Sequence, residues 1–268
     1  MTRIGFGWLC LAAAGAALAQ SKEERGKQVV NEALEALGGQ RFLAMKDRTE
    51  AGRVYSFYRG DLSGLAVAKV YTRYVNPPEG PPPGSAAVRE RQSFGKDDEE
   101  YAVLFTGDAA YQVTFRGAKP LPDDVVERYR ESALRNIFYI LKNRLNEPGL
   151  LIESAGSDVW ANQPVEMVDI TDSRNRTVTV YFHRSLKVPV RQLTYRRDTK
   201  TKQRTEEITE FGKYRDVKGV QWPFTIRRLR DGEKIFEGFF ESVTINSGLP
   251  DKLFTLPSQM RMLKKDGS

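Results

Sequence analysis

The side chains that could carry out chemistry are few and far apart in this sequence. The single histidine, His183, ends the segment TVTVYFH, and one histidine cannot supply a multi-histidine metal site. No serine lies in a Gly-X-Ser-X-Gly context, and the glycine patterns of phosphate loops and dinucleotide folds are absent. We therefore predict no enzyme activity, no metal ligand and no cofactor, and we interpret His183 as a surface residue at a strand end.

Two groups of carboxylates have the composition to act as a pair or to bind a cation. The run DDEE occupies positions 97–100, and Glu206 is followed directly by Glu207. A run of like charges is typical of a solvated turn, and adjacent residues of a strand point to opposite faces. Both groups are therefore interpreted as structural rather than catalytic.

The N-terminus has the pattern of a signal peptide. Arg3 precedes an apolar run from Ile4 to Leu18, and small residues stand at Ala17 and Ala19. Cleavage after Ala19 would remove the only cysteine in the chain and lower the formal charge from +7 to +6. We expect residues 1–19 to be a signal peptide and residues 20–268 to form a single exported domain without disulfides.

Helical spacing occurs in two segments of the expected mature chain. In residues 21–37, apolar residues recur at intervals of three and four, and Gly38 follows as a cap. In residues 122–145, Pro122 and two aspartates mark the start, and basic residues mark the end. We predict one continuous helix here, with an apolar stripe formed by Val126, Leu134, Ile137, Phe138, Leu141 and Leu145.

Strand patterns fill the rest of the chain, and turn signals separate them at short, regular intervals. Five strands are expected between residues 47 and 117, and six between residues 164 and 245. Short connections favour antiparallel pairing of neighbours. The fold class is therefore mainly β: an antiparallel, half-open β-barrel of about eleven strands, with two helices covering its concave face.

Two other features of composition bear on partners. The proline-rich stretch NPPEGPPPGSAA is interpreted as a stiff spacer between two strands, with a proline-recognition peptide as the alternative. The basic segments TYRRDTKTKQR and TIRRLRDGEK lie at hairpin turns. They are interpreted as solvated tips, with a docking patch for an anionic membrane surface or an acidic envelope protein as the alternative. Export argues against nucleic acid as a partner.

Several framework segments resemble one known family. These segments are ALGG at the end of the first helix, Gly-X-X-Pro-Leu-Pro before the second, YRDVKGVQWPFTI, and the closing LPDKLFTLP. They resemble the exported outer-membrane lipoprotein-sorting carriers of the LolA/LolB-like fold. The resemblance implies a periplasmic location and a half-open barrel that holds acyl chains. It also implies an arginine that latches the lid helices, for which Arg53, Arg59 and Arg73 are candidates that no motif distinguishes.

Two functional hypotheses follow for what we expect to be a monomer. The first is a non-catalytic carrier or chaperone that shields a lipoprotein acyl chain, a lipid or another apolar ligand in the barrel trough. The second is a partner-binding or envelope-sensor module on the same fold with no open cavity. For the carrier, the predicted trough is lined by apolar residues of alternating strands: Phe57, Val67, Tyr71, Phe105, Val113, Phe115, Val178, Val180, Phe182, Phe224 and Ile226.

Overall fold

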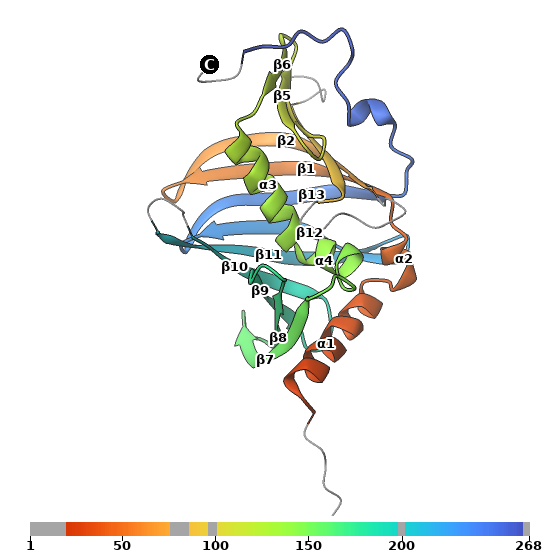
Figure 1. Cartoon of the computed structure of the whole chain (residues 1–268), viewed down its shortest axis with the longest axis vertical. Helices are drawn as coiled ribbons and strands as arrows, with labels where there is room; N and C mark the ends of the chain where they lie inside the picture. Colours follow the sequence, from red (N-terminus) through yellow and green to blue (C-terminus); the bar gives the residue numbers. More distant parts are fainter. Residues whose placement is uncertain (1–19, 76–85, 96–100, 198–201, 265–268) are drawn as a thin grey trace, which may run out of the picture.

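The computed structural model describes residues 20–75, 86–95, 101–197 and 202–264, which form one open sheet with helices on one face (Figure 1). The strands are β1 Asp47–Tyr58, β2 Asp61–Tyr74, β3 Val88–Phe94, β4 Tyr101–Phe105, β5 Ala110–Thr114, β6 Gly117–Pro120, β7 Leu151–Trp160, β8 Gln163–Thr171, β9 Thr177–His183, β10 Pro189–Arg197, β11 Arg204–Val217, β12 Val220–Arg230 and β13 Glu233–Ile245. The helices are α1 Lys22–Ala36, α2 Gln40–Leu43, α3 Asp123–Arg135, α4 Ile137–Asn143 and the 3₁₀ turn Asp251–Leu253.

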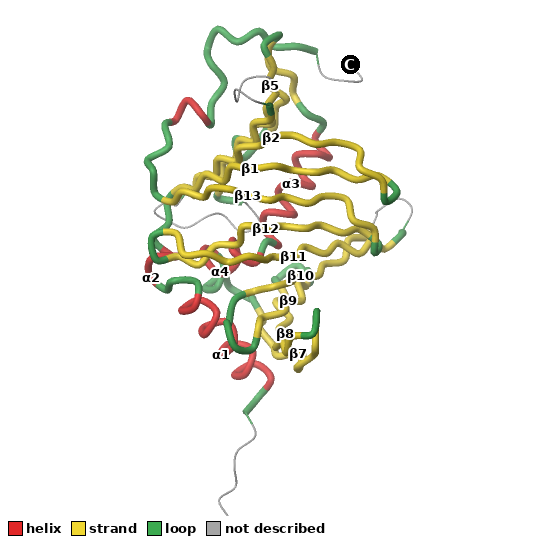
Figure 2. The backbone as a smooth tube through the Cα atoms, turned by 180° about the vertical axis from the view of Figure 1, so that it is seen from behind, coloured by secondary structure: helices red, strands yellow, loops and turns green. Residues whose placement is uncertain are grey.

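The strand order explains why helices cross the sheet. The order is β6-β5-β4-β3-β2-β1-β13-β12-β11-β10-β9-β8-β7, with every neighbouring pair antiparallel. Two meanders therefore meet where β1 pairs with β13, and β6 and β7 are the two edges (Figure 2). Because the chain must pass from β6 to β7, the connecting segment runs from one edge to the other, and α3 and α4 lie in that segment. We call the face that they cover the inner face.

The predicted count of about eleven strands is too low, and the sheet does not close into a barrel. The two strands that the sequence did not reveal are β6 and β7, which form the edges. β6 has only four residues, and β7 combines Gly156 with a run of small and polar residues that lacks a clear alternation. Edge strands have only one neighbour, so they need less apolar patterning than central strands do.

The predicted single helix over 122–145 is also wrong, because it is two helices. Asn136 lies between α3 and α4 with φ −69° and ψ 125°, an extended conformation that ends α3. Its side-chain oxygen accepts hydrogen bonds from the backbone N–H groups of Phe138 and Tyr139, at 3.0 and 3.3 Å. Asparagine is a favoured N-cap, so one residue both breaks the helix and starts the next.

α1 is fixed at both ends and lies on the β7 side of the sheet. A capping box joins Ser21 and Glu24 at its start. Gly26 lets the helix approach β7, since a Cβ there would lie 2.8 Å from backbone atoms of Glu153 and Ser154. At its end, the φ of Gly38 is 120°, and a Cβ there would lie 2.4 Å from the carbonyl oxygen of Gly219. The two glycines therefore set how closely α1 packs on the sheet.

The main core lies between the sheet and the two helices α1 and α4. Buried side chains of β8 and β9 belong to one cluster with Val30, Ala33 and Leu37 of the α1 region and with Ile140 and Leu141 of α4. No helix within the described residues is long and apolar enough to cross a membrane.

Candidate ligand-binding site

A cavity of about 210 Å³ lies between α3 and the inner face of the sheet. We call it the central cavity. It is lined by side chains from β1, β2, β3, β11, β12 and β13, with α3 and the start of α4 as its cover. Its apolar lining includes Val54, Ala68, Val70, Val88, Phe94, Ala133, Phe138, Phe211, Trp222, Ile226, Phe236 and Phe240.

The floor of the central cavity is charged. The Nε of Arg48 donates to Glu50 at 3.0 Å, and its two terminal nitrogens donate to the hydroxyls of Tyr74 and Thr72 at 2.7 and 3.1 Å. The indole Nε1 of Trp222 donates to the other oxygen of Glu50 at 2.8 Å, and the Arg48 guanidinium lies 4.4 Å from the Trp222 ring centre. A buried charge of this kind is tolerated only when its hydrogen-bonding capacity is met, as it is here.

A second carboxylate connects this floor to α3. Burial raises the pKa of Glu90, while Gln92 and Arg48 oppose the shift. Burial and the charge of Glu90 together raise the pKa of Tyr129 well above its ordinary range, so the Tyr129 hydroxyl stays protonated and bonds to Glu90. The Tyr129 ring also stacks on Phe105 with centroids 3.6 Å apart. Tyr129 is therefore a main contact of α3 with the sheet.

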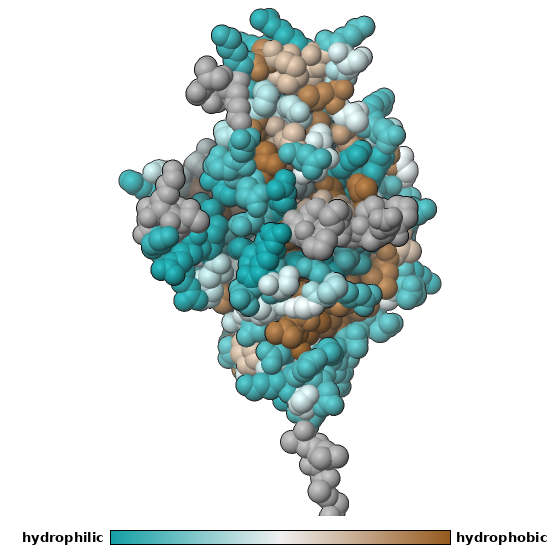
Figure 3. Space-filling model, in the orientation of Figure 1, coloured by the Kyte–Doolittle hydropathy of each residue, from teal (hydrophilic) through white to brown (hydrophobic). Residues whose placement is uncertain are grey.

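A second cavity of about 370 Å³ adjoins the first, on the side of α3 that faces β10, β11 and β12. Arg128 and Arg135 of α3 and Arg196, Arg228 and Arg230 of the strands line it, together with the two carboxylates Glu131 and Glu207. We call it the arginine pocket. The two cavities share Gln92, Tyr129, Ser132, Asn136, Phe211, Ile226 and Arg228, so they lie directly side by side. Figure 3 shows mostly hydrophilic surface around the middle of the face that carries α3.

The structure brings only part of the predicted trough together. Ile226 lines both cavities, and Phe105 lines the arginine pocket. Val178, Val180, Phe182 and Phe224 are buried in the main core, where α1 and α4 fill the space. Val113 belongs to a smaller core with Leu104. Phe57 lies at the end of β1 beneath the ammonium of Lys234. Their role in ligand binding stays a prediction.

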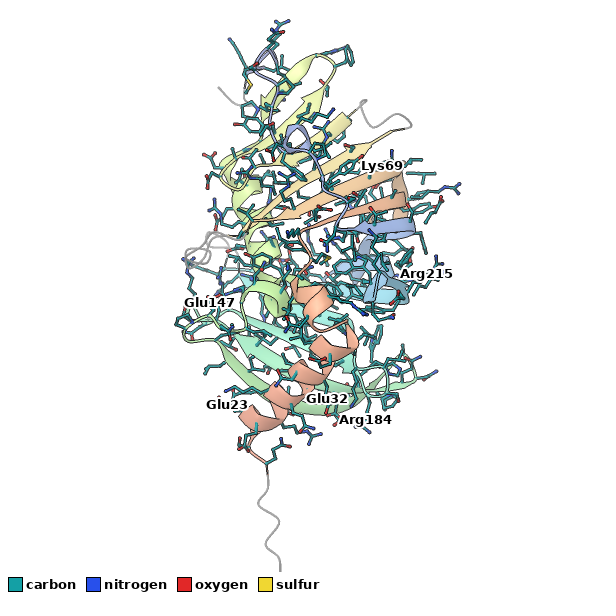
Figure 4. All side chains as sticks on the ribbon, turned by 90° about the vertical axis from the view of Figure 1, so that its right-hand side faces the viewer. Glu23, Glu32, Lys69, Glu147, Arg184 and Arg215 are labelled. Atoms are coloured by element: carbon teal, nitrogen blue, oxygen red, sulfur yellow. The ribbon has the colours of Figure 1, made fainter. Side chains whose placement is uncertain are left out.

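Val67, Tyr71 and Phe115 do not line the central cavity. Ala68, Val70 and Thr72 of β2 line it, and the residues between them must point to the other face because side chains alternate along a strand. Figure 4 shows Lys69, which alternates with them, on the side of the sheet away from α3. Phe115 is 86% exposed at the β5–β6 turn.

The residues of the predicted lid divide between the two helices. Ile137, Phe138 and Leu141 belong to α4 and are buried, and Leu134 is the single buried residue of α3. Leu145 follows α4 and packs partly against the core, and Val126 lines a separate surface pocket beside β5 and β6. Of the six, Phe138 alone lines the central cavity.

None of the three candidate latch arginines reaches a lid helix through a contact that the structure describes. Arg53 lies 3.8 Å from Glu241, Arg59 lies in the β1–β2 turn beside Tyr58, and Arg73 pairs with Asp251. The arginine that faces the cavity is Arg48, which sequence reasoning missed. The sequence did contain one indication: Arg48, Glu50 and Val54 are separated by even numbers of residues, which places all three on one face of β1.

The other candidates for chemistry have structural roles. The Nδ1 of His183 accepts hydrogen bonds from the backbone N–H groups of Ser185 and Leu186, so it caps a turn. Glu206 accepts from the Tyr195 hydroxyl at 3.1 Å, and Glu207 lines the arginine pocket. In the part of the chain that the structure describes, no group of three or more His, Cys, Asp or Glu could hold a metal ion. The acidic run at 97–100 and the proline-rich residues 76–85 lie outside the described residues.

This arrangement defines a structural class: an open antiparallel sheet with a cavity between its inner face and a covering helix. No protein-family model and no curated protein matches the sequence. Among solved structures, a putative outer membrane lipoprotein-sorting protein domain from Vibrio parahaemolyticus has a TM-score of 0.56 at 12% identity, over 86% of this chain and 97% of that chain.

Two further solved structures are similar to this chain over most of its length. A DUF1329 family protein from Desulfovibrio piger has a TM-score of 0.59 at 11% identity, over 88% of this chain and 98% of that one. A LolA superfamily protein from Nitrosomonas europaea has a TM-score of 0.50 at 12% identity, over 88% and 98%. The chain therefore has a LolA-like fold, as the resemblance of its framework segments implied.

Proposed function

We propose that this protein is an exported, non-catalytic carrier or chaperone that holds an acyl chain or another apolar ligand in the central cavity. The observation that carries the proposal is the cavity itself, which α3 covers and which twelve apolar side chains line. Burial of a chain there would be favoured by the area removed from water rather than by directional bonds. The lipoprotein-sorting domain of similar fold supports the same class of function.

The weak packing of α3 on the sheet is compatible with a carrier that must admit a ligand. Only Leu134 of its thirteen residues is buried, whereas five of the seven residues of α4 are buried. The central cavity, at about 210 Å³, is smaller than the pockets of about 300–1,000 Å³ that usually hold small molecules. A full acyl chain would therefore extend into the arginine pocket or displace α3, and α3 has few buried contacts to lose.

The location and assembly that go with this function are part of the proposal. Residues 1–19 would direct export and be removed near Ala19, and residues 20–268 would act as a monomeric periplasmic domain. Lipoprotein acyl chains or free lipids would be the cargo, and an anionic membrane surface or an envelope protein would be the partner.

Two substitutions in β2, one on each face of the strand, test the proposed carrier function. Native mass spectrometry and lipid extraction of protein exported with its signal peptide should reveal one co-purifying acyl species per chain. Val70→Trp, which places a bulky ring in the central cavity, should abolish that species. Val67→Trp, three residues away on the opposite face and 47% exposed, should retain it.

The alternative, a partner-binding module, is favoured by one observation. The outer face of the sheet exposes Leu65 and Val67 of β2 and Phe239 of β13, at 60%, 47% and 37%, with β1 between the two strands. If no lipid co-purifies with or loads onto folded protein, this surface becomes the next site to study and the carrier proposal fails.

A further inference from the structure

We propose that the arginine pocket binds the anionic head group of an amphiphile whose chain lies in the central cavity. The inference rests on the proposed carrier function and names the chemistry of its ligand: a carboxylate or a phosphate attached to an acyl chain.

The first support is an excess of positive charge. Five arginines line the pocket and only two carboxylates do. Glu207 is shared, at 3.6 Å from Arg196 and 3.9 Å from Arg230, and Glu131 lies 3.7 Å from Arg135. These distances exceed those of a charge-assisted hydrogen bond, about 2.7–2.9 Å, so these pairs leave most guanidinium donors of Arg135, Arg196 and Arg230 unused. Arg128 differs, because it pairs with Asp124 outside the pocket at 3.0 Å.

The second support is the state of two particular arginines. The side chain of Arg135 is only 12% exposed, and its Nε is buried with no hydrogen-bond partner in the described structure. A buried donor without a partner is costly, and an anion in the pocket would satisfy it. Arg228 forms no salt bridge with any residue that the structure describes. Its guanidinium lies 5.3 Å from the centre of the Phe236 ring.

The third support is the position of Arg228 and Ile226 where the two cavities adjoin. Arg228 and Ile226 are neighbours on the same face of β12, and both line both cavities. A head group at Arg228 would therefore have its chain beside Ile226 and Phe236, under α3. The opposite orientation would place the anion at the floor, where the donors of Arg48 are already used by Glu50, Tyr74 and Thr72.

Three lipids with the same sixteen-carbon chain separate head-group chemistry from chain binding. We would titrate palmitate, palmitoyl lysophosphatidic acid and neutral monopalmitoylglycerol into the mature protein by calorimetry, below their micelle concentrations. We expect at least one anionic lipid to bind about tenfold or more tightly than the neutral one, because charge-assisted bonds stabilise the bound anion. Which anion binds better distinguishes a fatty acid from a phospholipid.

Arg228→Gln and Arg135→Gln, singly and together, should reduce the affinity for the anionic lipids toward that of the neutral lipid and leave neutral binding unchanged. Arg227→Gln is the matched control, because Arg227 is adjacent on β12 but pairs with Glu237 and Glu210. If Arg135→Gln does not fold, Arg228→Gln alone carries the test, since that side chain is exposed and has no ion pair in the described structure to lose.

The outcomes separate this inference from the function it rests on. Equal affinity for all three lipids would overturn the head-group site and leave the carrier intact. No binding of any lipid would overturn both. An equal loss in Arg227→Gln would show a general effect of surface charge and would also overturn the site.

Discussion

The inner face of the sheet has two halves that are built in different ways. Under α1 and α4, strands β8 and β9 present apolar side chains that pack into a filled core; we call this the filled half. Under α3, strands β1, β2, β3, β11, β12 and β13 surround the central cavity with a charged floor; we call this the hollow half. One continuous sheet therefore has both a region built for stability and a region that leaves space.

The difference comes from the helices as much as from the strands. α4 buries five consecutive residues, Ile137 to Leu141, whereas α3 is charged along most of its length and buries only Leu134. A helix with little apolar surface cannot fill the space beneath it, so the hollow half depends on side-chain hydrogen bonds for order. The main core and the proposed binding site therefore lie in different parts of one surface, so mutation can test them separately.

The largest expected effect compares one phenylalanine from each half. Phe182→Ala in the filled half, where the side chain is 1% exposed, should lower the free energy of unfolding by about 3–5 kcal/mol. Phe236→Ala in the hollow half should cost about 1–1.5 kcal/mol, because this half-buried ring gains roughly half of the full transfer energy. Urea denaturation measures both. Equal costs would mean that the hollow half is packed like the filled one.

The framework was predictable from the sequence, because it follows from local patterns. The antiparallel meander was predictable from the alternation in β1 and β2 and from the turn signals between the later strands. The end of the first covering helix was predictable from Gly38. β6 and β7 were missed because edge strands carry little apolar pattern. The break at Asn136 was missed because the apolar stripe of residues 122–145 continues across it.

The site was less predictable, because a strand pattern does not say which of its two faces points inward. On β2, Val67 and Tyr71 lie on the outer face, whereas Ala68, Val70, Thr72 and Tyr74 line the central cavity. Each face has a valine and a tyrosine, so residue type alone does not distinguish the two faces. The prediction of Val67 and Tyr71 as lining residues therefore took the face that does not line this cavity. Spacing places Arg48 and Glu50 on one face of β1, but only the packing of α3 over the sheet, between segments far apart in sequence, shows that this face is the inner one.

The second prediction concerns the charged floor of the hollow half. Glu50 accepts from both Arg48 and Trp222, and an amide at this position has only one accepting oxygen. Glu50→Gln should therefore lower the free energy of unfolding by about 1–3 kcal/mol, the cost of a buried donor that loses its partner. Glu241→Gln is the control, since Glu241 is exposed and lies 3.8 Å from Arg53. The control should change stability by less than about 0.5 kcal/mol. A similar small change in Glu50→Gln would mean that the floor does not order the hollow half.

The last prediction is a dependence on pH at the boundary between the two halves. Lys142 of α4 donates to the carbonyl oxygen of Leu43 and lies 5.0 Å from the ring centre of Tyr74, whose hydroxyl bonds to Arg48. Burial lowers the pKa of Lys142 to about 8, so the unfolded chain holds this proton more strongly than the folded protein does. Between about pH 8 and the ordinary value of 10.5, the unfolded state therefore binds more protons.

It follows that this lysine's contribution to stability should rise with pH across that window and be constant below it. The comparison is between the native protein and Lys142→Met, which removes the titrating group, by urea denaturation at pH 7, 8, 9 and 10. Subtracting one free energy from the other cancels the tyrosines and arginines that titrate in both proteins. A difference that stays flat or falls above pH 8 would show that the ammonium is solvated. The C-terminal end of α4 would then be exposed to solvent, and Lys142 would lie outside the filled half.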